Sequence, residues 1–184
     1  MNENKNNFLY EVLKFSIITL LIVLPFRMYI AKPFIVNGAS MSPTFETGDY
    51  LIVDEITYKI NEPERGEVVV FKYPLDPSRF FIKRIVGLPN ETIEIKNGAV
   101  FIKNKNNPDG FQLEEEYILN KSYKNTVYSL SDGQYFVMGD NRSNSSDSRT
   151  WGSLDKNFII GRAFIRLLPL NQIDFMPGNF DFIY

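Results

Sequence analysis

The chain has no histidine and no cysteine among its 184 residues. Without histidine a Ser-His-Asp triad cannot form, and without cysteine neither a thiol nucleophile nor a zinc site of Cys and His ligands is possible. The absence of cysteine also excludes disulfides and leaves the cellular compartment open. Nucleophilic hydrolysis by this chain would therefore need a base other than histidine.

Basic residues are not in excess, since 20 Lys and Arg stand against 22 Asp and Glu and the formal net charge is -2. Binding to nucleic acid needs a basic surface that neutralises phosphates, so nucleic acid is not an expected partner. The hydrophobic share of 44% supports one domain with a substantial core, whereas the length is short for two such domains.

A long apolar run lies near the N-terminus. Residues 15–26 carry no charge, and apolar character extends over residues 8–30. A transmembrane helix needs about 20 mostly apolar residues. This stretch supplies them if Glu11, Lys14 and Arg27 lie near the membrane surfaces.

A cleavable secretory signal and a buried helix of a soluble protein would also explain this run. A secretory signal should end in small residues at alternate positions, but the only small candidate nearby is Ala31, with Tyr29 two positions before it. We therefore expect an uncleaved anchor, with residues 1–30 as an N-terminal segment and transmembrane helix and residues 31–184 as a separate domain. Basic residues lie on both sides of the run, so charge does not predict its orientation.

Residues 31–184 have the composition of an all-β domain, with short β-branched or aromatic runs separated by turn residues. The runs cover residues 33–37, 49–55, 67–73, 80–88, 91–96, 99–103, 134–140 and 157–168. Asn97 and Gly98, between two alternating runs, predict a hairpin with a tight turn. We expect a mainly β fold, an antiparallel sheet or partly open barrel, preceded by one N-terminal transmembrane helix.

Three segments contain candidate catalytic groups, and the first surrounds Ser40. The small residues Gly38 and Ala39 precede it and would let a substrate backbone approach, while Pro43 restrains the chain behind it. A simple surface turn explains the same residues. Ser42 is a rival nucleophile, two positions further on and on the same face if the strand persists.

The second segment is the run at residues 80–88, where alternation places Phe81, Lys83 and Ile85 on one face. Burial among apolar neighbours disfavours the charged form of a lysine and can lower its pKa from ~10.4 to about 7–8, which allows it to act as a general base. The alternative is an ordinary strand lysine whose amine reaches the solvent.

The third segment, residues 138–149, is a polar loop with two Asp, two Arg and four Ser between apolar runs. Turn formers dominate it, as they do in any surface loop. Its charges and hydroxyls can also form a fixed hydrogen-bonded shelf, and a hydroxyl from such a shelf could orient a neutral lysine.

In this order after an apolar N-terminal run, Ser-Met-x-Pro-Thr, Lys-Arg-x-x-Gly-Leu-Pro and Gly-Asp-Asn-Arg-x-Asn-Ser-x-Asp-Ser-Arg resemble the motifs of the signal peptidase I family. The match covers nearly the whole chain. The resemblance implies a serine peptidase without metal or cofactor, in which Ser40 rather than Ser42 is the nucleophile and Lys83 is its general base. It also implies supporting residues: Ser145 as the hydroxyl that positions the lysine, and Arg84, Asp140, Asp147 and Arg149 as a salt-bridge shelf.

Two positions depart from the family pattern. Some relatives carry a serine two residues before the nucleophile, where its hydroxyl assists the oxyanion hole, and this chain has Gly38 there. We expect the Ser40 N–H to be the chief oxyanion donor, since backbone amides can stabilise a tetrahedral oxyanion. Ser143 stands where the motif commonly carries Asp, which removes one possible ion pair and leaves the Ser-Lys pair intact.

The resemblance further implies the partners, which are signal peptides of exported preproteins and the lipid bilayer. It places a single-pass anchor in the plasma membrane and the catalytic domain on the extracytoplasmic side. An extended substrate could pair as an added strand beside residues 34–36 or 81–83. Family matching gives the pocket walls, which ordinary core packing would explain equally well: Phe34, Val36, Met41, Phe81 and Ile82. The sequence leaves the preproteins and the oligomeric state open.

Three other functions share some of these features. A self-cleaving repressor uses the same Ser/Lys chemistry but should carry a DNA-binding segment in place of an anchor. A membrane-tethered binding protein could retain the motifs without turnover, though the presence of both Ser40 and Lys83 argues against decay. A carboxylate hydrolase based on Asp140 and Asp147 would need no histidine and should work best at acidic pH.

Two further segments receive no catalytic role. The three glutamates at residues 114–116 are expected to lie in a solvated loop or at a strand end. The tail, residues 175–184, carries amphipathic aromatic residues that could reach the membrane interface or pack against the β domain.

Overall fold

The computed structural model describes residues 8, 10–21, 31–121 and 125–182. Residues 10–21 are helical. Among the described residues, no helix combines the length and the apolar character needed to cross a membrane. Residues 22–30, the second part of the expected anchor, lie outside the described residues.

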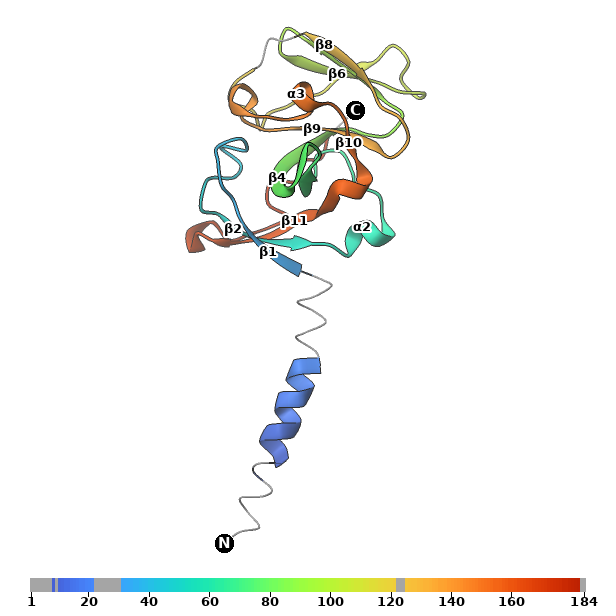
Figure 1. The fold of residues 1–184 in the computed structure, drawn as a ribbon. Coiled ribbons are helices and arrows are strands. Elements are labelled where there is room, and N and C mark those ends of the chain that lie inside the picture. Colours follow the sequence, from blue (N-terminus) through green and yellow to red (C-terminus); the bar gives the residue numbers. More distant parts are fainter. Residues whose placement is uncertain (1–7, 9, 22–30, 122–124, 183–184) are drawn as a thin grey trace.

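The described residues from Ala31 onward form two sheets, and every strand pair among them is antiparallel (Figure 1). The larger sheet has eight strands in the order β1-β2-β11-β3-β4-β9-β10, with β12 paired to β11. These strands are β1 (Ala31–Ile35), β2 (Tyr50–Asp54), β3 (Val68–Tyr73), β4 (Asp76–Gly87), β9 (Gln134–Met138), β10 (Leu154–Asp155), β11 (Ile159–Leu168) and β12 (Asp174–Phe175).

The smaller sheet has four strands in the order β7-β6-β5-β8. They are β5 (Thr92–Lys96), β6 (Ala99–Lys103), β7 (Phe111–Gln112) and β8 (Thr126–Ser129). Short helical turns connect the strands: α2 (Thr57–Ile60), η1 (Arg142–Asn144), α3 (Ser148–Trp151), η2 (Lys156–Phe158) and η3 (Leu170–Gln172).

The mainly β, antiparallel fold predicted from the sequence is confirmed, and each predicted run overlaps a strand. Alternation explains why, since β5 and β6 bury every second residue against the core. The predicted hairpin between them is also confirmed. Asn97 (φ 50°) and Gly98 (φ 80°) take the left-handed conformation that a tight hairpin turn requires.

Strand β4 is fixed from both faces. Val86 packs in a cluster with the smaller sheet, Ile82 packs against the cluster around Val36 and Phe45, and Ile85 belongs to a third cluster. Fully burying one such aliphatic side chain contributes about 1.5–3 kcal/mol. The strand that carries the candidate lysine is therefore held rigidly in the core.

Two strand edges remain open. Strand β1 is the last strand at one end of the larger sheet. Strand β4 pairs with β3 over most of its length but with β9 only from residue 84 onward. Among the described residues, the first part of β4 thus has one edge without a strand partner, and so has β1.

Candidate active site

Ser40 lies in a turn after β1, where the chain leaves the sheet. The turn is pinned by buried side chains, since Met41 is 1% exposed and Phe45 is fully buried. The strand ends at residue 35, so Ser42 does not continue a strand face as expected. Its hydroxyl donates instead to Oε1 of Glu46 at 2.6 Å.

Lys83 extends from β4 to the nucleophile turn. Its Nζ donates hydrogen bonds to Oγ of Ser40 and to the carbonyl oxygen of Ile82, both at 2.7 Å. The residue is 3% exposed, and the Phe81 ring centroid lies 5.4 Å from Nζ. Lys83 is therefore buried on an apolar face of the strand, as the first of the two interpretations of the sequence predicted.

The environment of Lys83 favours a neutral amine. Burial lowers its pKa from 10.5 to about 8, although the negative charges of Asp147 and Asp140 act in the opposite direction. A group with a pKa near 8 is partly deprotonated at neutral pH, as a general base must be. The same two carboxylates would stabilise the ammonium that forms once the amine accepts a proton.

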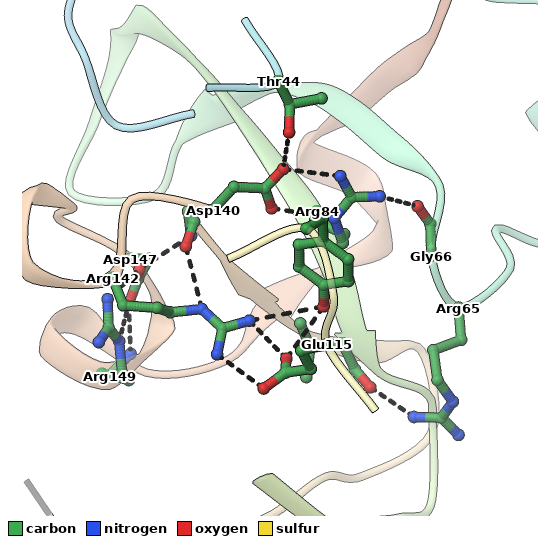
Figure 2. A network of polar contacts seen from close by, with 12 residues as sticks. Thr44, Arg65, Gly66, Arg84, Glu115, Asp140, Arg142, Asp147 and Arg149 are labelled. Atoms are coloured by element: carbon green, nitrogen blue, oxygen red, sulfur yellow. Dashed lines mark hydrogen bonds and ion pairs between the residues drawn. The ribbon is translucent and has the colours of Figure 1, made fainter. Parts of the chain in front are cut away.

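Arg84 follows Lys83 and, by strand alternation, lies on the opposite face of β4. Its guanidinium pairs with both oxygens of Asp140, at 2.9 and 2.6 Å, and these two side chains are almost completely buried (Figure 2). It also donates to the carbonyl oxygens of Gly66 and Gly178. Thr44 donates to Asp140 at 2.5 Å, so this pair ties β4 to the nucleophile turn.

Asp147 and Arg149 form a second buried pair, with two hydrogen bonds of 2.8 and 2.7 Å. Asp147 also accepts from the Gly139 N–H at 3.0 Å. Burial by itself raises the pKa of Asp147, but the hydrogen bond and charge of Arg149 outweigh it and hold the pKa below its ordinary value. Asp147 is therefore a fixed negative charge close to the lysine.

Arg142 and Glu115 form a third buried pair, which the sequence did not indicate. Their side chains are 2% and 5% exposed, and two hydrogen bonds of 2.9 and 2.5 Å join them. The expectation of a solvated position for residues 114–116 is wrong for Glu115, because its carboxylate neutralises a buried guanidinium. Arg142 also donates to the Gly139 carbonyl at 3.1 Å and so supports the polar loop.

Ser145 lies within this loop, and its hydroxyl is not hydrogen-bonded to the lysine. Among the described residues its buried oxygen makes no hydrogen bond of full geometry, but it lies near enough to the Asp147 carboxylate to help lower the pKa of that group. A Cβ on Gly139 would lie 2.3 Å from this oxygen and 2.4 Å from the Ser40 carbonyl oxygen. Only glycine at position 139 allows the polar loop to approach the nucleophile turn this closely.

A groove of about 620 Å³ opens beside the Ser-Lys pair. Four of the five predicted wall residues line it together with Ser40 and Lys83: Phe34, Val36, Phe81 and Ile82. Met41 is not among the lining residues, because it packs in the core with Val36. Several lining residues were not predicted as pocket walls, and four of them are polar: Asn37, Arg79, Asn144 and Ser146. Their polar character gave no signal distinct from that of other polar residues in the sequence.

The aromatic tail packs against the β domain in its described part. The rings of Phe180 and Phe182 lie 5.0 and 6.2 Å from the ring of Tyr117, whereas Phe175 is 68% exposed. Residues 183–184 lie outside the described residues. Within the described residues, no cluster of three or more metal-ligating side chains is present.

A serine hydroxyl and a buried amine on the floor of an apolar groove are the features of a serine endopeptidase, and comparison with known proteins gives the family. The family model described as "Signal peptidase, peptidase S26" matches residues 9–168. The chain therefore belongs to the signal peptidase family, peptidase S26.

Relatives of this chain agree with that assignment. It is 38% identical to the probable signal peptidase I-1 of Synechocystis sp., covering 96% of this chain and 90% of that protein. It is 37% identical to signal peptidase I of Leptolyngbya laminosa, covering 90% and 82%. A crystal structure of a signal peptidase I from Enterococcus faecalis V583 matches 56% of this chain and 97% of that one, with a TM-score of 0.48 and 26% identity.

Proposed function

We propose that the chain is a membrane-bound endopeptidase that removes N-terminal signal peptides from exported preproteins through a Ser40-Lys83 dyad. The observation that carries the proposal is the 2.7 Å separation between Ser40 Oγ and the amine of Lys83, a residue that is only 3% exposed. The names of the relatives, signal peptidase I, support the substrate class.

The proposed reaction is acyl transfer. Neutral Lys83 accepts the proton of the Ser40 hydroxyl, and the oxygen attacks the carbonyl carbon of the scissile peptide bond. The tetrahedral intermediate collapses when the lysine gives its proton to the leaving amine, which breaks the C–N bond and leaves an acyl-enzyme. Lys83 then accepts a proton from water, whose oxygen attacks the ester carbon. The bond from that carbon to Ser40 Oγ breaks as the lysine returns its proton to Oγ, which releases the carboxylic product and restores Ser40 and the neutral amine.

An extended peptide fits between the two open strand edges. Strands β1 and β4 both contribute residues to the groove, and each has one edge without a strand partner among the described residues. A peptide could therefore hydrogen-bond to either edge through its main chain. Alternate side chains of such a strand point to the same face. This geometry suits the substrates that the family resemblance implies, which are cut after small residues at the first and third positions before the bond.

The test uses the full chain, purified in detergent and incubated with a preprotein. We expect Ser40→Ala and Lys83→Met to abolish cleavage while both variants still unfold in a cooperative thermal transition at a temperature no lower than that of the wild type. Ser42→Ala is the matched control and should retain turnover, since its hydroxyl is engaged by Glu46. Cleavage retained by either dyad variant at the wild-type rate would refute the proposed mechanism.

We also propose that residues 1–30 anchor the chain in the plasma membrane and that residues 31–184 form the extracytoplasmic catalytic domain. The absence of native cysteine allows a direct test, because a single introduced thiol has no background. Lys105→Cys places it on an exposed loop after β6. A membrane-impermeant maleimide should label this variant in intact cells, and labelling only after lysis would refute the topology.

A further inference from the structure

Asn141 holds the backbone of the nucleophile turn at two points. Its N–H donates to the Ser40 carbonyl oxygen at 3.1 Å, and its side-chain Nδ2 donates to the Ala39 carbonyl oxygen at 3.0 Å. Asn141 and Ala39 are 102 positions apart in the sequence. One residue of the polar loop therefore fixes two successive peptide units around the nucleophile.

The side-chain bond acts on the peptide unit that matters most for catalysis. The Ala39 carbonyl and the Ser40 N–H belong to the same planar trans peptide unit, so they point in opposite directions and turn together. Among the described residues, the Ser40 N–H donates no hydrogen bond. It is thus available to an oxyanion, and a hydrogen bond to the carbonyl at the other end makes it a better donor.

The nucleophile turn has few other restraints on this unit. Gly38 has φ 102° and carries no side chain, and a Cβ built there would meet no atom within 4 Å. The Ala39 carbonyl also accepts from the Ser42 N–H at 3.3 Å, but this bond lies within the turn and would move with it. The bond from Asn141 is the one that ties the unit to another part of the domain.

Asn141 is itself well placed to act as a restraint. Its Oδ1 accepts from the Ser143 hydroxyl at 3.3 Å and from Asn120 Nδ2 at 3.5 Å, which leaves Nδ2 directed at the Ala39 carbonyl. The residues on either side of it in the chain are Asp140 and Arg142, and both are locked in buried ion pairs. The amide therefore sits on a rigid base.

We propose that Asn141 is a positioning residue, which orients the Ala39-Ser40 peptide unit so that the Ser40 N–H faces the developing oxyanion. This inference rests on the proposed peptidase function. It also suits a chain with Gly38 two residues before the nucleophile, because glycine supplies no side-chain hydroxyl and the orientation of the backbone donor then matters more.

The experiment compares Asn141→Ala, which removes the side-chain donor, with Asn141→Asp, which keeps the size but can only accept. Asn120→Ala is the matched control, because it touches the Asn141 oxygen and not the nucleophile turn. Removing a whole oxyanion donor costs roughly 10²–10³ in kcat, so loss of its orientation should lower kcat by roughly 10–100-fold. KM should not change, and the pH dependence set by Lys83 should not change in Asn141→Ala, whereas the new carboxylate of Asn141→Asp would itself raise the pKa of Lys83.

A second readout separates positioning from folding. A peptide aldehyde forms a tetrahedral adduct on Ser40, and its affinity should fall by the same factor as kcat/KM. Binding of an uncleaved peptide to the same variants in a Ser40→Ala background should stay unchanged. Equal weakening of both ligands, or a lower unfolding temperature with wild-type kcat, would overturn the proposal.

The two proposals fail in different ways. Wild-type turnover in Ser40→Ala or Lys83→Met would refute the dyad itself. Wild-type kcat in both Asn141 variants, with the dyad variants inactive, would refute only the positioning role. A shift of the acid limb in Asn141→Ala, which adds no charge, would also refute it, because the effect would then act through the lysine.

Discussion

Replacing Lys83 by methionine should abolish activity and at the same time stabilise the fold at neutral pH. The amine is 3% exposed, and burial lowers its pKa from 10.5 to about 8. Methionine has a similar length and carries no charge, so it can occupy the same space without the cost of burying an ammonium group. The catalytic site therefore lowers the stability of the protein that carries it.

The magnitude follows from the shift in pKa. A drop from 10.5 to about 8 corresponds to about 3 kcal/mol between the two protonation states. Because the folded pKa lies below the unfolded one, the unfolded chain binds the proton more tightly. The wild type thus loses stability as the pH falls from 10.5 to about 8, and the full cost is present below that range. Lys83→Met has no such cost.

The assay is urea unfolding of the full-length wild type and Lys83→Met at a series of pH values between about pH 7 and pH 11. On going from the highest to the lowest pH, the unfolding free energy of the variant should rise relative to that of the wild type by about 3 kcal/mol. The lost hydrogen bonds of the amine subtract about 1 kcal/mol each at every pH and leave this change intact. Lys72→Met, at an exposed position of β3, controls for removal of a lysine. A difference that stays flat across this range would refute the reasoning.

Three further outcomes are expected. The acid limb of kcat/KM should have an apparent pKa near 8, because Lys83 must be neutral to act, and a limb in the acidic range would point to carboxylates instead. Gly139→Ala should lose activity and lower the unfolding temperature, since its Cβ would lie 2.4 Å from the Ser40 carbonyl oxygen; normal turnover would contradict the close approach. Glu115→Gln should lower the unfolding free energy by on the order of 3 kcal/mol, because it leaves a buried guanidinium unpaired. Glu114→Gln, at an exposed position, should change the unfolding free energy by less than about 0.5 kcal/mol. If urea unfolding gave the same change for Glu114→Gln and Glu115→Gln, the result would contradict the argument that the buried Glu115 carboxylate matters and the exposed Glu114 carboxylate does not.

The strands could be predicted because their signal is local. Period-two burial in β5 and β6 and the Asn97-Gly98 turn are readable from a few adjacent residues. Strands β7, β10 and β12 have two residues each, and only pairing with distant strands defines them. The membrane anchor stays a prediction, since part of the run lies outside the described residues.

The candidate site was predictable in part for the same reason. Alternation in β4 predicted that Lys83 lies between apolar neighbours and left open whether its amine reaches the solvent, and both its role and the choice of Ser40 over Ser42 needed the family resemblance. The structure supplies the physical reason, because β1 ends before the turn and Glu46 engages Ser42.

Other residues gave no signal because their partners are remote. Glu115 and its arginine are 27 positions apart, and Asn141 and Ala39 are 102 positions apart. Such pairs arise only when the sheets assemble. Composition and periodicity describe a residue and its near neighbours, so they carry no information about these contacts.

The order of two adjacent cations in β4 makes the alignment of this strand unusually strict. Lys83 must be able to give up its charge in the groove, whereas arginine side chains keep theirs in proteins. A slip of the strand by one residue would exchange the two faces. The permanently charged guanidinium would then sit beside Ser40, and the amine would face Asp140 without the second nitrogen needed for a forked bond. A shift of β4 by one residue would therefore disrupt the catalytic site and the buried ion pair at the same time. A stably folded protein with β4 in the shifted register and an inactive site is not expected.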